Sequence, residues 1–154
     1  MKFIYSLFAF LLLAGTAISQ DSTAPKVFML GDDEESYEQL NQAYSQTLLE
    51  ACNNDIQEAF DQWLDMMKAM DNYADKIKYD LKGIQLWLHV FWAEDGSIDH
   101  IGYLLRPESR NVNPAELNAF FSTFMKKYKF PLKSEKKFNH YTGATFPTFI
   151  QRAN

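Results

Sequence analysis

Three histidines and one neighbouring acid are the residues of this 154-residue chain whose types could do chemistry. His89, His100 and His140 all lie in the second half of the chain, and Asp99 directly precedes His100. Imidazole nitrogens bind metals, and a histidine beside a carboxylate can act as a general base near neutral pH. These four residues are the candidate set for a small metal-binding or hydrolytic enzyme.

The turn between two predicted strands decides whether His89 and His100 could act together. Residues 87–105 carry apolar, strand-like runs on both sides of Asp95-Gly96, which is a strong hairpin signal. A two-residue turn at Asp95-Gly96 puts both histidines on one face of the sheet. A three-residue loop that adds Glu94 puts them on opposite faces. Apolar residues match across the strands in both registers, so the sequence leaves both open.

No other catalytic pattern is found in the sequence, which lacks a glycine-rich phosphate loop, an HExxH motif and a nucleophile elbow. Cys52 lies in a helical apolar stripe, where we expect a small core residue. We therefore expect no catalytic residue, no metal and no cofactor. Aromatic and cationic side chains in and after the hairpin are candidates for binding, because arginines pair well with carboxylates. These candidates are Trp87, His89, Phe91, Tyr103, Arg106 and Arg110.

The second half of the chain, residues 81–150, predicts a small antiparallel sheet with one helix. Strands are expected at 84–93 and 97–106. Asn113-Pro114 then opens a helix, because asparagine is a favoured N-cap and proline suits the first helical position. A last extended segment covers 138–150. The order strand, strand, helix, strand predicts an α+β layer.

The first half, residues 26–80, predicts an edge strand or a docking segment, followed by a helical hairpin. Residues 26–30 are brief and apolar. Apolar residues then recur at three- and four-residue steps from Tyr37 to Ala51, and again from Ile56 to Ile77, which predicts two amphipathic helices packed on the sheet. The second stripe is rich in methionine. We interpret it as core, with an adaptable partner-binding groove as the alternative.

Four motifs of residues 83–149 follow one another in a familiar order. They are the turn at Asp95-Gly96, a helix that opens on Asn113, the pair Phe130-Pro131, and Pro147 to Phe149. In this order the segment resembles the TonB C-terminal domain. The resemblance implies a periplasmic, non-catalytic module that binds partner proteins by offering a sheet edge to a peptide strand. Three departures are the lack of a convincing transmembrane anchor, the lack of a proline-rich spacer, and the helical segment 32–77, which has no counterpart in the family.

The N-terminus has the pattern of a secretory signal peptide. Lys2 gives a positive start, residues 3–13 are apolar, and small residues follow up to a predicted cleavage after Ser19. An uncleaved anchor is the alternative, but a spanning helix needs about 20 apolar residues. We therefore expect a signal peptide at 1–19, a single domain at 20–154 and no stable membrane span after processing.

Charge and cysteine content limit the partners and the cross-links that this chain can have. Residues 32–80 hold thirteen acids and three bases, and residues 81–154 hold six acids and ten bases. The net charge of −5 argues against nucleic acid as a partner. A single cysteine excludes an intramolecular disulfide, and no Asn-x-Ser/Thr sequon is present, which favours a bacterial periplasmic or extracellular location.

The function that these patterns favour is an exported, non-catalytic binding module for a protein or peptide partner. A small histidine-based enzyme is one alternative. A carrier of an apolar small molecule, held between the methionine-rich helix and the sheet, is the other. The sequence does not name the partner and leaves the oligomeric state open.

Overall fold

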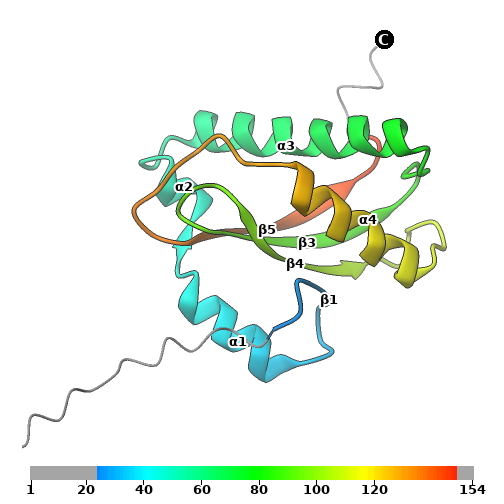
Figure 1. Cartoon of the computed structure of the whole chain (residues 1–154), viewed down its shortest axis with the longest axis horizontal. Helices are drawn as coiled ribbons and strands as arrows, with labels where there is room; N and C mark the ends of the chain where they lie inside the picture. Colours follow the sequence, from blue (N-terminus) through cyan, green and yellow to red (C-terminus); the bar gives the residue numbers. More distant parts are fainter. Residues whose placement is uncertain (1–23, 149–154) are drawn as a thin grey trace, which may run out of the picture.

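The computed structural model describes residues 24–148, which form a five-stranded sheet with helices on both faces (Figure 1). The predicted signal peptide at 1–19 and the end of the predicted last strand at 149–150 lie outside these residues. The elements in chain order are β1 (Val27–Met29), α1 (Glu34–Ala43), β2 (Gln46–Thr47), α2 (Leu48–Ala51), α3 (Ile56–Ile77), β3 (Gln85–Trp92), β4 (Ile98–Leu105), α4 (Pro114–Lys127) and β5 (Phe138–Thr145).

The sheet has the strand order β1-β4-β3-β5-β2. β3 pairs antiparallel with β4 and with β5, so the predicted α+β layer of two strands, a helix and a third strand is confirmed. β1 is an edge strand, as predicted, and runs parallel to β4. β2 was not predicted; it adds two residues parallel to the start of β5. No helix within residues 24–148 is long and apolar enough to cross a membrane.

The β3–β4 hairpin contains both of the registers that the sequence left open. Away from the turn, His89 pairs with Gly102, as the two-residue turn predicts. Beside the turn, the N–H of Ala93 donates to the carbonyl of Ser97 at 2.9 Å, as the three-residue loop predicts. A β-bulge that leaves Asp99 unpaired joins the two registers. Because of this bulge, the two histidines of the hairpin share one face of the sheet.

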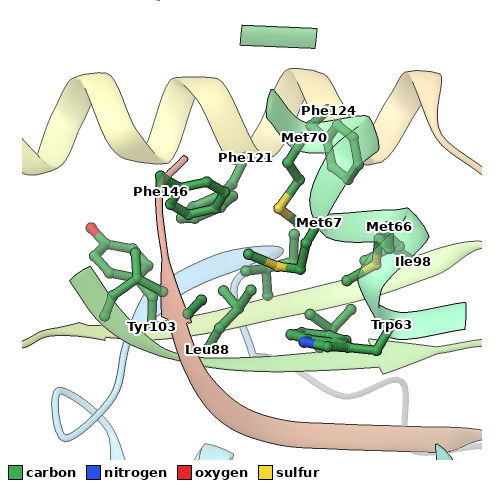
Figure 2. Close-up of a cluster of buried hydrophobic side chains, with 14 of the residues drawn as sticks. Trp63, Met66, Met67, Met70, Leu88, Ile98, Tyr103, Phe121, Phe124 and Phe146 are labelled. Atoms are coloured by element: carbon green, nitrogen blue, oxygen red, sulfur yellow. The ribbon is translucent and has the colours of Figure 1, made fainter. Parts of the chain in front are cut away.

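One face of the sheet is covered by α3 and α4, and the main core lies between them (Figures 1 and 2). α3 contributes its methionines, including Met66 and Met70, which are fully buried, and α4 contributes Phe121 and Phe124. These side chains pack on apolar residues of the sheet such as Leu88. Burial of each such side chain stabilises the fold by about 1.5–3 kcal/mol.

The opposite face of the sheet is covered in part by α1. Leu40 of α1 and Tyr44, the residue that directly follows α1, pack on Phe91 of β3 in a second, smaller cluster. Phe28 joins this cluster by crossing over Gly102, where a Cβ atom would lie 2.9 Å from the Phe28 ring. The sheet is therefore packed on two sides.

The predicted two-helix hairpin is not confirmed. Residues 34–51 form α1, β2 and α2 instead of one helix, and α1 lies on the face of the sheet opposite to α3. The chain restarts as a helix at Thr47, whose side chain accepts from the N–H of Glu50 while the Glu50 carboxylate accepts from the N–H of Thr47. This capping box satisfies backbone groups that a continuous helix would have bonded internally.

Candidate functional site

The imidazole of His89 links β3 to α1 and to β5. The phenol of Tyr37 donates to Nδ1 of His89 at 2.8 Å, and Nε2–H of His89 donates to Oδ1 of Asn139 at 2.9 Å. The amide of Asn139 then donates to the carbonyls of Tyr44 and Gln46. Burial lowers the pKa of His89, so the ring is neutral and both nitrogens are used.

His100 and the bulge residue Asp99 also bind neighbouring elements. Nδ1–H of His100 donates to the carbonyl of Pro25 at 2.9 Å, and Asp99 accepts from the phenol of Tyr44 at 2.7 Å. Burial lowers the pKa of His100 as well. These contacts hold the C-terminal end of α1 and the segment just before β1 against the sheet.

His89 and His100 do not form a joint site. The Phe91 ring lies between them, with its centroid 4.0 Å from that of His89 and 6.4 Å from that of His100. His140 points to the other face of the sheet, where its ring is 4.6 Å from that of Trp63. Among residues 24–148, no three potential metal ligands come together.

Four of the candidate binding residues lie on the face of the sheet that α1 covers in part. Phe91 is buried there, and Trp87 remains 39% exposed. Trp87 stacks on Tyr141, which is 49% exposed, and the guanidinium of Arg106 lies 5.6 Å above the Trp87 ring. Trp87 and Tyr141 thus form an exposed aromatic platform, with Arg106 above it. The side chains of His89 and Phe91 pack against each other and against α1.

Tyr103 and Arg110 lie apart from that platform. Tyr103 points to the opposite face, where its buried ring packs against Phe121 of α4. The guanidinium of Arg110 donates to the backbone carbonyls of Asp80 and Lys82 and so holds the loop before β3. The structure therefore does not bring the six predicted binding residues into one site.

Among residues 24–148, one edge of β5 is mostly unpaired. β2 pairs with it only at Phe138 and Asn139, and within the described part of the chain no strand pairs with residues 140–145 on that side. The stretch His140–Phe146 contains no lysine, acid or proline. Exposed edges of soluble proteins usually carry such residues, because a bare edge can pair with any extended chain.

The backbone groups at this edge point away from the sheet. The N–H of Phe146 donates to the carbonyl of Ile84, which precedes β3, at 2.9 Å. Since backbone direction alternates along a strand, Tyr141, Gly143 and Thr145 direct their N–H and C=O groups away from β3. These three residues offer a ladder of donors and acceptors to a further strand.

An apolar groove of about 730 Å³ runs between this edge and the N-terminal half of α3. His140, Thr142 and Ala144 of β5 line one side, and Phe60, Trp63 and Leu64 of α3 line the other. Ile56 and Phe60 are exposed to 73% and 57%, and Leu49 to 37%. Burial lowers the pKa of His140 to about 4, so its side chain enters the groove uncharged.

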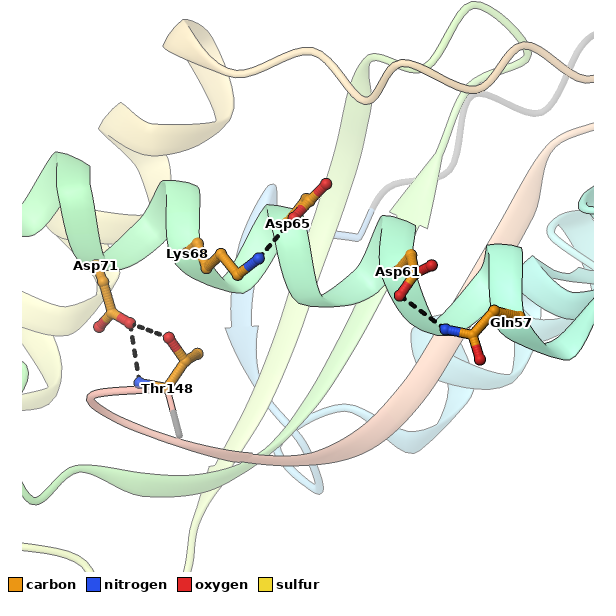
Figure 3. Close-up of polar contacts among 6 residues, drawn as sticks. All are labelled: Gln57, Asp61, Asp65, Lys68, Asp71 and Thr148. Carbon is orange, nitrogen blue, oxygen red and sulfur yellow. Dashed lines mark hydrogen bonds and ion pairs between the residues drawn. The ribbon is translucent and has the colours of Figure 1, made fainter. Parts of the chain in front are cut away.

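α3 also contacts Thr148, which lines the groove and follows β5 in the chain (Figure 3). Oδ2 of the buried Asp71 accepts from the N–H of Thr148 at 2.9 Å and from its hydroxyl at 2.6 Å. Figure 3 also shows the exposed Asp61, bonded by Gln57, and the exposed Asp65, paired with Lys68. The outer side of α3 is therefore lined with carboxylates.

The groove was not predicted as the main site, because Ile56 and Phe60 continue the apolar stripe of α3. The apolar residues of α3 divide into two groups. Ile56 and Phe60 stay exposed. The residues that enter the core are Met66, Met67, Met70 and Ala74. Ile56, Phe60 and Leu64 widen the apolar face of the helix at the start of α3. This wide apolar face is the signal that could have indicated a second contact surface.

Comparison with known protein families, characterised proteins and solved structures gave no match to this chain.

Proposed function

We propose that this protein is an exported, non-catalytic binding module that takes an extended segment of a partner protein as an added strand along β5. The observation that carries the proposal is the uncovered edge at residues 140–145, where Tyr141, Gly143 and Thr145 direct their backbone groups outward. Strand addition gives affinity through main-chain hydrogen bonds and specificity through pockets for alternate side chains.

The surroundings of the edge support this mode of binding. Side chains of an added strand alternate between the two faces of the sheet. On one face they reach the groove beside Phe60 and Leu64, and on the other they reach Tyr141, which is stacked on Trp87. The partner segment therefore meets apolar surface on both sides.

The proposal agrees with the resemblance of residues 83–149 to the TonB C-terminal domain, which implies a periplasmic module that offers a sheet edge. The signal-peptide pattern at 1–19 supports export. The histidines favour the binding module over an enzyme, because both ring nitrogens of His89 and the Nδ1 of His100 hold neighbouring elements.

A selection of random decapeptides against the wild-type protein tests the proposal. Thr145→Pro removes an outward N–H without touching the ladder to β3, whereas Thr145→Val keeps that N–H. Phe60→Asp places a charge in the groove, and Ile77→Asp is its matched control, because Ile77 is an exposed apolar residue of α3 outside the groove.

We expect peptides that bind the wild type, Thr145→Val and Ile77→Asp alike, but lose at least about tenfold in affinity to Thr145→Pro and Phe60→Asp. Amide exchange of Tyr141, Gly143 and Thr145 should slow when such a peptide binds. The proposal fails if no peptide is selected, or if binding is the same in the edge and groove variants and their controls.

A further inference from the structure

The charge of α3 indicates what kind of strand the groove accepts, and this inference rests on the proposed function. α3 holds five acids, Glu58, Asp61, Asp65, Asp71 and Asp75, against two bases, Lys68 and Lys76. We infer that the partner segment is a strand of about six residues that carries lysine or arginine among apolar residues.

Asp61 is the acid that points to this conclusion most directly. Asp61 is exposed, and it directly follows Phe60, which lines the groove. Among the described residues, Asp61 accepts one hydrogen bond, from the side-chain amide of Gln57. Lysine and arginine have long apolar stems that lie on hydrophobic surface while the charged head stays in water. A basic side chain of the partner can therefore cover Phe60 with its stem and reach Asp61 with its head.

The alternation of a strand limits where these basic residues occur. Only every second side chain of an added strand faces α3, and the others face Tyr141 on the opposite side of the sheet. Basic residues that pair with the α3 carboxylates are therefore expected at alternate positions of the partner segment.

The same charges argue against a second copy of this chain as the occupant. Two copies joined edge to edge by their β5 strands would bring their α3 helices side by side across a two-fold axis. Asp61 of each copy would then approach the acidic helix of the other. Like charges placed together at an interface suppress that pairing.

Peptides from the random selection test the inference. Those whose binding is lost in Thr145→Pro but kept in Thr145→Val are sequenced, and their lysine and arginine content is compared with their aspartate and glutamate content. One such peptide is then titrated against Asp61→Lys and against Asp75→Lys, a matched exposed acid near the other end of α3. We expect a basic excess at alternate positions and a loss of about three- to tenfold in Asp61→Lys, with a change below about twofold in Asp75→Lys.

Each other outcome overturns the inference in its own way. Edge-dependent peptides without a basic excess, or an equal effect of both charge reversals, refute it and leave strand addition in place. The absence of any edge-dependent peptide refutes the proposed function itself. A dimer in sedimentation that Thr145→Pro converts to monomer identifies a second copy as the occupant. Binding that requires deletion of residues 149–154 identifies that segment as the occupant.

Discussion

The phenol of Tyr37 donates a hydrogen bond to Nδ1 of His89 at 2.8 Å and so fastens α1 to the central strand of the sheet. The other ring nitrogen of His89 donates to Asn139 of β5. Both nitrogens of a buried, neutral imidazole are thus used in packing contacts. His89, a candidate for catalysis in the sequence, thus holds α1 and β5 against β3.

Tyr37→Phe should lower the free energy of unfolding by ~1–2 kcal/mol, because it leaves the buried Nδ1 of His89 without a donor. Urea unfolding monitored by tryptophan fluorescence measures the change. Tyr141→Phe is the control, since Tyr141 is half exposed, and we expect a change within ~0.5 kcal/mol. Equal effects of the two substitutions would contradict the assigned role of Tyr37.

Stability should fall as the pH drops from 6.5 toward 4. Burial lowers the pKa of His89, His100 and His140 in the folded state, that of His140 to about 4, whereas the unfolded chain takes up these protons near pH 6.5. Between these values the unfolded state binds more protons, so each histidine contributes a slope of up to ~1.4 kcal/mol per pH unit.

Urea unfolding at neutral pH and at about pH 5 measures this loss, in a range where most carboxylates remain ionised. His140→Gln should reduce the loss, because glutamine does not titrate. A wild-type stability that is flat over this range would show that the histidines are not buried as neutral groups.

Asp71→Ala should destabilise the protein by ~1–3 kcal/mol, because it leaves the N–H and hydroxyl of the buried Thr148 without their acceptor. Asp75→Ala, at an exposed position one turn along the same helix, should have little effect. Amide exchange near Thr148 should accelerate only in the first variant. Equal stability of both variants would show that this contact does not hold the end of β5.

Gly96→Ala should be more harmful than Gly31→Ala, although both glycines have a positive φ, of 87° and 97°. A Cβ at Gly96 would lie 2.2 Å from the carbonyl oxygen of Phe130, whereas a Cβ at Gly31 would meet nothing within 4 Å. We expect a loss of ~1 kcal/mol for Gly31→Ala from backbone strain alone. The loss for Gly96→Ala should exceed it by at least ~2 kcal/mol, as measured by thermal unfolding.

Local signals in the sequence were sufficient for the elements whose stability is decided by a few neighbouring residues. Asn113 caps α4 by accepting from the N–H of Ala115, and Asp55 caps α3 by accepting from the N–H of Glu58. The Asp95-Gly96 turn lies where predicted. In each case the side chain and the backbone group that it satisfies are at most three residues apart, so the pattern can be seen in one stretch of sequence.

Only the tertiary structure decided how these elements face one another. The apolar periodicity of residues 34–51 correctly predicted the helical parts, α1 and α2. It did not predict that β2 separates them, or that α1 lies on the face of the sheet opposite to α3. The amide of Asn139 reaches the carbonyl of Gln46 across 93 residues, and such a contact has no local signature. Whether Phe60 is buried in the core or lines a groove depends on the position of β5 relative to α3 in the folded chain. The sequence by itself determined where the capped helices begin and where the hairpin turns, because caps and tight turns involve residues that are close together in the chain. The free edge and its groove were decided by packing between distant segments, because burial depends on neighbours that only the folded chain brings together.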